Sequence, residues 1–243
     1  MAVRRWLVAG VVLGLTGGVW SDEACAARRR FAWLLDTDTV PERTAEVEWW
    51  AWERSRALDR TVYFTVEGVV GLTDTIELGF PLEVWMNQIG GTVAVYGMEA
   101  KWRLFSADPA KAGPVVPLLR VGVLRFGQAD SWRVEADAVV SVDLGGSLHL
   151  VGDAGGYYDN FDSRYYFTGG AGVSVAVTDE LSLGAEFYAE ATIATKGQEE
   201  RWVSLGPNAT FTHGRFWVTA AIPFGLTREA PDFVPKIIWA VAF

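Results

Sequence analysis

Hydrophobic and polar residues alternate with a period of two along most of the chain, from about residue 44 to the end. In the clearest stretch, 132–144, apolar residues alternate with Arg133, Glu135 and Asp137. This period is that of a β-strand with one apolar face and one polar face. It predicts twelve strands, at about 44–54, 61–70, 75–85, 92–105, 115–126, 132–144, 148–158, 165–177, 181–192, 201–212, 216–225 and 236–243.

The connectors between these strands alternate in length. Short turns rich in Gly, Asp and Thr lie at 71–74, 145–147, 178–180 and 213–215, whereas 159–164, 195–200 and 226–235 are longer polar loops. The connector 106–113 is the exception, since it is long but lies on the side of the short turns. Short turns at one rim and longer loops at the other are typical of outer-membrane barrels.

A soluble β-sandwich is the alternative interpretation of this pattern. Strands of about ten residues match the length that a tilted transmembrane strand requires. Their second face carries many charges, which the dry core of a sandwich could not hold. The chain is 50% hydrophobic, yet it has no apolar run long enough for a membrane-spanning helix. We therefore predict an all-β fold, a transmembrane antiparallel up-and-down β-barrel of about 12 strands over residues 44–243, in the outer membrane of a Gram-negative bacterium.

The N-terminus has the features of a secretory signal peptide. Arg4 and Arg5 precede an apolar stretch, 6–20, and Ala24-Cys25-Ala26 fits the rule for a cleavage site. We predict a signal peptide over residues 1–26 and a periplasmic lead-in over residues 27–43. Cleavage after Ala26 would remove the only cysteine of the chain, so the mature protein would have no disulfide.

One turn-and-strand phrase, Gly71-Leu-Thr-Asp-Thr-Ile-Glu-Leu-Gly-Phe-Pro81, resembles the outer-membrane family named for the MetA pathway of phenol degradation. A related phrase recurs at Val177-Thr-Asp-Glu-Leu-Ser-Leu-Gly-Ala-Glu-Phe187, and the lead-in Asp36-Thr-Asp-Thr-Val-Pro41 is also similar. The resemblance implies a β-barrel that passes small molecules across the outer membrane. It implies no catalytic residues.

The alternation assigns twelve charged residues to the inner face of the predicted barrel, where we expect them to line a pore. We expect Arg120 to lie between Glu99 and Asp137 and, more widely, a basic sector on the fourth to sixth strands facing an acidic sector elsewhere. Opposed charges would select which solutes pass; alternatively, they form a polar plug that stiffens a closed barrel. The predicted pore-lining residues are Glu67, Glu77, Glu83, Glu99, Lys101, Arg103, Arg120, Arg133, Glu135, Asp137, Glu186 and Glu190.

Two further features of the strands lead to predictions. Gly170 and Gly172 are expected opposite Tyr188 and Glu186, where an aromatic ring folded over a glycine would brace the sheet. The last strand is expected to place four apolar side chains toward lipid and to end in a signal for the outer-membrane assembly machinery. These four residues are Ile237, Trp239, Val241 and Phe243.

Several functional classes are disfavoured by the sequence. The net charge of −9 argues against nucleic acid as a partner. No nucleotide-binding motif is present, and the two histidines, His149 and His213, are far apart, so we predict no cofactor and no metal site. We predict a non-enzymatic barrel that passes an unidentified small-molecule solute. The alternatives are a closed structural barrel, or one that binds partners through 195–200 and 226–235, and more remotely a lipid hydrolase.

Overall fold

The structure is a computed structural model, and it describes residues 29–56, 59–87, 90–105, 113–127, 130–160, 163–193 and 201–243. The predicted signal peptide and the loop 195–200 lie outside these residues, as does most of the connector 106–113. No helix in the described part is long and apolar enough to cross a bilayer. Its strands are β1 (Ala45–Arg56), β2 (Asp59–Thr73), β3 (Ile76–Asn87), β4 (Thr92–Arg103), β5 (Val115–Phe126), β6 (Ser131–Leu144), β7 (Leu148–Asp159), β8 (Arg164–Ala176), β9 (Leu181–Ile193), β10 (Arg201–His213), β11 (Phe216–Ala221), β12 (Phe224–Gly225) and β13 (Lys236–Ala242).

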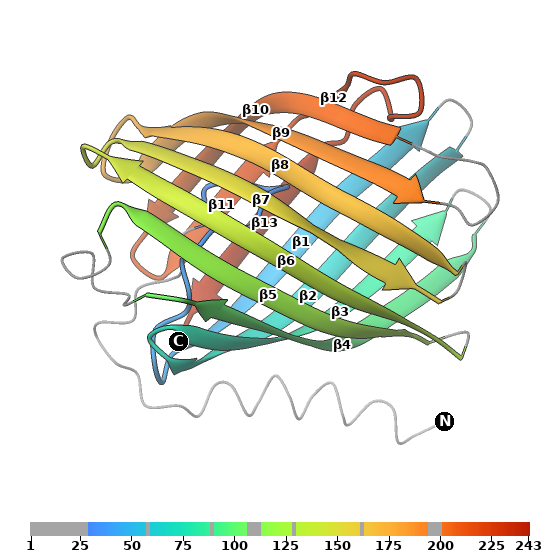
Figure 1. Cartoon of the computed structure of the whole chain (residues 1–243), viewed down its shortest axis with the longest axis horizontal. Coiled ribbons are helices and arrows are strands. Elements are labelled where there is room, and N and C mark those ends of the chain that lie inside the picture. The colour runs from blue at the N-terminus through green and yellow to red at the C-terminus, as the bar shows by residue number, and fades with distance from the viewer. Residues whose placement is uncertain are drawn as a thin grey trace.

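These strands form one closed antiparallel barrel (Figure 1). Each strand from β1 to β10 pairs with its neighbour in sequence, and β13 closes the ring between β1 and β11, which in turn pairs with β10. Both β11 and β12 pair with β10, so they are two parts of one interrupted strand. The 13 strands of the described chain therefore amount to twelve positions in the wall, which confirms the predicted fold.

The interruption between β11 and β12 differs from the single strand predicted at 216–225. It falls at Ile222 and Pro223. Proline has no amide hydrogen to donate to a neighbouring strand, so the ladder breaks there. The period of two continued through this position and gave no sign of the break.

The wall has an apolar outer surface and a polar inner surface. On β5, the outward-facing Val121 and Val123 are each 57% exposed, while Leu118 on the inward face is 1% exposed. On β13, Ile237 is exposed, whereas Ile238 and Ala240 face inward and are buried. Because the ring of strands is closed, it has no unpaired strand edge, and its apolar outer surface suits contact with lipid.

The connectors of the two rims differ less in length than predicted, since the predicted longer loop at 159–164 spans only 160–163, as many residues as the turn 177–180. We call the rim that carries the turns 74–75, 145–147, 177–180 and 214–215 the turn rim, and the opposite rim, which carries 226–235, the loop rim. Both ends of the barrel domain lie at the turn rim. Phe243 donates its backbone N–H to the carbonyl of Ala45 at 2.7 Å, and Ala45 N–H donates to Phe243 O at 3.3 Å.

The described part of the predicted lead-in, 29–43, lies inside the barrel rather than ahead of it (Figure 1). We call this stretch the N-terminal segment. Phe31 is fully buried, and Leu34 and Val40 are nearly so. The segment has no regular secondary structure, so it carried no periodic pattern that could have placed it within the wall.

Candidate functional site in the barrel lumen

The N-terminal segment packs against glycines in the barrel wall. Gly170 lies opposite Tyr188 and Gly172 opposite Glu186, as predicted. The space above both glycines, however, is filled by Phe31 and Leu34 of the segment, not by a ring from the neighbouring strand. A β-carbon on Gly172 would overlap the Phe31 ring, and one on Gly170 would overlap Leu34. These glycines therefore make room for the segment.

Apolar contacts hold the segment between opposite walls. Phe31 and Leu34 join a buried cluster with Leu118, Val139 and Val151 on β5, β6 and β7. Across the lumen, Ala32 packs in a cluster with Trp217, Ala221, Ile238, Ala240 and Ala242 on β11 and β13. In the ring, β13 and β6 are diametrically opposed. The segment therefore spans the lumen from side to side.

Carboxylates of the wall accept hydrogen bonds from the backbone of the segment. Glu186 accepts the N–H groups of Ala32, Trp33 and Leu34 at 3.2, 2.8 and 3.3 Å. Glu77 accepts the N–H of Val40 at 2.7 Å. Buried backbone N–H groups must donate hydrogen bonds, and a segment without a neighbouring strand needs side-chain acceptors for them. Two of the predicted pore-lining acids thus hold the segment in place.

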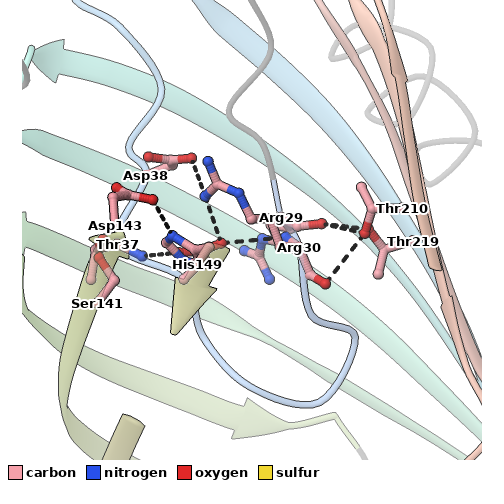
Figure 2. A network of polar contacts seen from close by, with 10 residues as sticks. Arg29, Arg30, Thr37, Asp38, Ser141, Asp143, His149, Thr210 and Thr219 are labelled. Atoms are coloured by element: carbon pink, nitrogen blue, oxygen red, sulfur yellow. Dashed lines mark hydrogen bonds and ion pairs between the residues drawn. The ribbon is translucent and has the colours of Figure 1, made fainter. Parts of the chain in front are cut away.

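A polar network ties the segment to the wall near the turn rim (Figure 2). Asp36 binds Arg30 Nη1 at 3.3 Å, and its Oδ1 lies 3.0 Å from His149 Nε2. The other ring nitrogen of His149 lies 2.8 Å from Asp143, which is opposite it on β6. Burial opposes ionisation of Asp36, but Arg30 and His149 together hold its pKa well below the usual range. Asp36 is therefore charged at neutral pH.

Hydroxyl groups extend this network on either side (Figure 2). Thr37 Oγ1 lies 2.5 Å from Ser141 Oγ on β6. Thr210 and Thr219, on β10 and β11, both donate to the carbonyl of Arg29. The segment is thus anchored at the beginning and in the middle of its described length.

Arg120 lies at the centre of a cluster of carboxylates. Its guanidinium binds Asp137 at 2.8 Å, Glu135 at 2.8 Å and Glu99 at 3.0 Å. The predicted pairing of Arg120 with Asp137 across β5 and β6 is confirmed. The register predicted between β4 and β5 is wrong, because Glu99 lies opposite Gly122 and Lys101 lies opposite Arg120. The last pair of this ladder is Arg103 with Leu118, so residues 115–117 extend beyond the end of β4 and pair with β6 alone. Glu99 reaches Arg120 diagonally.

Two other inner bases, Lys101 and Arg133, also bind carboxylates. Lys101 Nζ lies 2.6 Å from Glu77 Oε1, and Arg133 Nη2 lies 3.0 Å from Asp159 Oδ2. Bases and acids therefore pair within the same stretch of wall, β3 to β7, and the expected separation into a basic and an acidic sector is not seen there. A buried base is stable when it is paired in this way.

The remaining predicted pore residues also face the lumen. Glu67 is fully buried, and its side chain meets that of Glu99 above Gly79. Glu83 accepts from Thr65 at 3.0 Å and from the Trp85 indole. Glu190 accepts from the hydroxyls of Tyr157 and Tyr188, each at 3.2 Å. The Arg103 Nε is buried without a hydrogen-bond partner among the described residues. A pore-lining role for these residues stays a prediction.

Several lumen residues were missed by sequence reasoning. Glu46 and Glu48 on β1 are buried, and they bind Trp217 Nε1 at 3.0 Å and Arg29 Nε at 3.2 Å. Their alternation with Val47 and Trp49 could have revealed them. Lys236, which faces the lumen from the start of β13, could have been found from the same parity. No sequence signal pointed to Arg29, because it belongs to the irregular segment.

In the described part of the barrel, cavities remain around the segment at three places in the interior. The outer cavity, toward the loop rim, has a volume of about 370 Å³ and an aromatic lining that includes Trp52, Trp85 and Trp202. The middle cavity measures about 190 Å³ and is lined by Arg29, Arg120 and Lys236 among others. Trp33, Tyr157 and Tyr188 line both. The third cavity, about 330 Å³, lies at the turn rim beside Arg30 and His149.

The loop 226–235 covers part of the loop rim. Val234 is fully buried and Ala230 nearly so, and both pack with Trp202, Trp33 and Tyr188. Leu226 and Phe233 remain exposed. Much of this loop therefore packs onto the interior, which leaves less of it free for the surface-binding role considered from the sequence.

Neither histidine has the setting that a barrel hydrolase requires. His149 lies inside the lumen between two aspartates, and His213 Nδ1 binds Glu180 at 2.5 Å at the turn rim. A lipid hydrolase would need a Ser–His pair on the lipid face. Among the described residues, no group of His, Cys, Asp and Glu side chains could hold a metal ion.

Comparison with known structures gives several outer-membrane barrels. The chain is similar to a COG4313 outer membrane channel from Pseudomonas putida F1, with a TM-score of 0.62 and 14% identity over 86% of this chain and 98% of that one. It is also similar to the KdgM porin in complex with disordered oligogalacturonate (TM-score 0.57, 8% identity, 82% and 99%). A third is the NanC porin (0.55, 9%, 80% and 98%). No family model and no curated sequence matches the chain. At these identities, the likeness concerns the fold.

Proposed function

We propose that the chain forms a channel for small solutes in the outer membrane of a Gram-negative bacterium. The observation that carries this proposal is the pair of cavities that share Trp33, Tyr157 and Tyr188 as lining residues and lead from the loop rim to the middle of the lumen. The fold is shared with outer-membrane porins and channels. Charged side chains line these cavities, so the solutes that fit the channel are polar or carry a charged group.

We further propose that residues 1–26 are a signal peptide and that the chain belongs to the family named for the MetA pathway of phenol degradation. The phrase at 71–81, its recurrence at 177–187 and the barrel fold support this assignment. The proposed partners are the lipid around the barrel, the assembly machinery that reads the end of β13, and the solute.

A closed barrel is the second candidate, and the N-terminal segment favours it. The network of Arg30, Asp36 and His149 lies between the middle cavity and the one at the turn rim. These two cavities share none of their lining residues. Passage through the whole barrel therefore requires the segment to shift, or the barrel serves a structural role.

Liposome swelling separates the two candidates. The mature protein and a variant that lacks residues 29–38 would be reconstituted and tested with a panel of sugars, amino acids and aromatic acids. Both proteins must first show the heat-dependent electrophoretic mobility of a folded barrel. Swelling with the wild type supports the channel, and faster swelling with the variant shows that the segment narrows it. Absence of swelling with both proteins contradicts the channel and favours the closed barrel.

A further inference from the structure

Lys236 has no ion-pair partner among the described residues, unlike Arg29, Arg120 and Arg133 of the lumen. Its Nζ lies 4.6 Å from the centre of the Trp50 ring and 4.7 Å from that of Trp33. No carboxylate of the described residues forms an ion pair with it, whereas Lys101 binds Glu77 at 2.6 Å. Two indole rings stabilise an ammonium group only in part, and they accept none of its directional hydrogen bonds.

Arg29 brings a second cation to the same indole. Its guanidinium carbon lies 4.8 Å from the centre of the Trp50 ring, and its Nε binds Glu48 at 3.2 Å. Arg29 is only 7% exposed, yet its Nη2 has no hydrogen-bond partner in the described part of the chain. Both Arg29 and Lys236 line the middle cavity.

Two cations that share one ring repel each other, and each has N–H groups to spare. A buried charge without a full set of partners is costly. An anion in the middle cavity that accepted from both groups would remove the repulsion and satisfy the free donors. This is the arrangement of a charge-assisted anion site.

The acids that line the middle cavity do not supply this anion. Glu135 and Asp137 are bound by Arg120, and Asp153 accepts from the backbone N–H of Leu35 at 3.4 Å. These acids lie on β6 and β7, across the barrel from β13 and β1. Their charge disfavours an anion at that end and so directs it toward Lys236 and Arg29.

We propose that the middle cavity binds one small organic carboxylate. Its carboxylate group accepts from Lys236 Nζ and the Arg29 guanidinium, and its apolar part rests against Trp33, Leu34 and Leu35, which line the same cavity. A volume of about 190 Å³ limits the ligand to a small molecule. That this ligand is a transported solute rests on the proposed channel function. Its binding in the middle cavity does not, because binding requires no transport.

Calorimetric titration of the purified barrel in detergent tests this site with three probes that differ in charge: benzoate, neutral benzamide and cationic benzylammonium. Benzoate is expected to bind, and the other two are not. Lys236→Met keeps the packing on both indoles and removes the charge, so it should weaken benzoate binding by about tenfold or more. Lys236→Arg keeps the charge and should retain binding.

Arg125→Gln is the matched control. It removes one positive charge from an exposed residue that pairs with Asp130 outside the cavity, so benzoate affinity should not change. Absence of benzoate binding to the wild type overturns the proposal, as does equal binding of benzamide or unchanged affinity in Lys236→Met. Benzoate binding without liposome swelling would contradict the channel and support the anion site. Liposome swelling without benzoate binding would support the channel and contradict the anion site.

Discussion

Arg120 is held by three carboxylates. Its removal would leave Asp137 without a base, and Glu99 and Glu135 with only longer contacts, to Lys101 at 3.6 Å and to Arg133 at 3.7 Å. Each donor–acceptor distance of Arg120 is 2.8 to 3.0 Å, and the four side chains are mostly buried. Removing one partner of a buried ion pair is strongly destabilising, because the remaining charges lose their compensation. The same groups face the middle cavity, so their charge also acts on any ion that passes.

We therefore expect Arg120→Ala to lower the free energy of unfolding by about 3 to 5 kcal/mol. Urea unfolding in lipid vesicles would measure this loss. The exposed pair of Arg125 provides the comparison, since Arg125→Gln should cost no more than about 1 kcal/mol. In planar bilayers, Arg120→Ala combined with Lys101→Ala should shift selectivity toward cations. Unchanged ion selectivity would contradict a role for these charges in the passage.

Gly172 and Gly152 offer a second test at the residue scale, because the same substitution meets different surroundings. A β-carbon at Gly172 would overlap the Phe31 ring, while one at Gly152 would meet only the Gly170 carbonyl oxygen, at 3.8 Å. Gly172→Ala should therefore dislodge the N-terminal segment, and Gly152→Ala should leave it in place. Trypsin cleavage after Arg30 would report this, with faster cleavage expected in Gly172→Ala. Equal rates in the two variants would show that the glycine does not seat Phe31.

At the scale of elements, the strands were predicted well, whereas the position of the N-terminal segment inside the barrel was not. The bounds of β5 match the prediction, since Val115 and Phe126 mark abrupt changes in pattern. The predicted register between β4 and β5 was wrong because it assumed that the connector joins the two strand ends symmetrically, whereas β5 begins three residues before its first pair with β4. The N-terminal segment is irregular, and its place is set by contacts with residues far away in sequence, such as Glu186 and Gly172. Such contacts leave no periodic pattern.

Asp36 governs the docking of that element in a pH-dependent way. It binds Arg30, His149 and the N–H of Thr37 at 2.8 Å, and its pKa in the folded protein lies below its usual value of about 3.9. Because the pKa of Asp36 is lower in the folded than in the unfolded protein, its charge stabilises the docked segment at any pH above the unfolded-state pKa. This stabilisation is lost as the pH falls from the unfolded-state pKa toward the folded-state pKa. Docking should persist at neutral pH and weaken below about pH 4.

Asp36→Asn removes the charge and should release the segment even at neutral pH. A nitroxide label on Glu42→Cys, at the exposed base of the segment, would report greater mobility in this variant. In this variant, the mobility of the label should not increase further when the pH falls below about 4, because the asparagine side chain has no charge to lose. A label that stays immobile in Asp36→Asn would show that the apolar contacts of Phe31 and Leu34 suffice for docking.

For the whole molecule, alternation with a charged inner face was enough to predict a closed transmembrane barrel, because few other folds tolerate it. The ends of the barrel were harder to interpret. The outward face of β13 follows the prediction, and Phe243, which follows β13, completes the seam with β1 through its two hydrogen bonds to Ala45. A role in assembly was inferred from sequence alone and remains to be tested.

Deletion of Phe243 should lower the amount of protein in the outer membrane and leave the conductance of each inserted molecule unchanged. The physical reason is that the deletion removes the terminal aromatic residue and two seam hydrogen bonds, far from the middle cavity. Immunoblots of membrane fractions and single-channel recordings would measure the two quantities, with Phe243→Tyr as a control that keeps the ring. Normal outer-membrane levels after the deletion would contradict an assembly role.

The N-terminal segment has one more consequence, which concerns the order of assembly. Its described part begins beside Thr210 and Thr219, near the β10–β11 turn, and ends at Thr44, so both ends of residues 29–43 lie toward the turn rim. This described stretch is therefore a loop that does not run through the ring from one rim to the other. It can enter after the barrel has closed, or be withdrawn without parting any two strands. The wall and its occupant can therefore form as separate events, and the barrel can exist in the membrane in both an empty and a filled form.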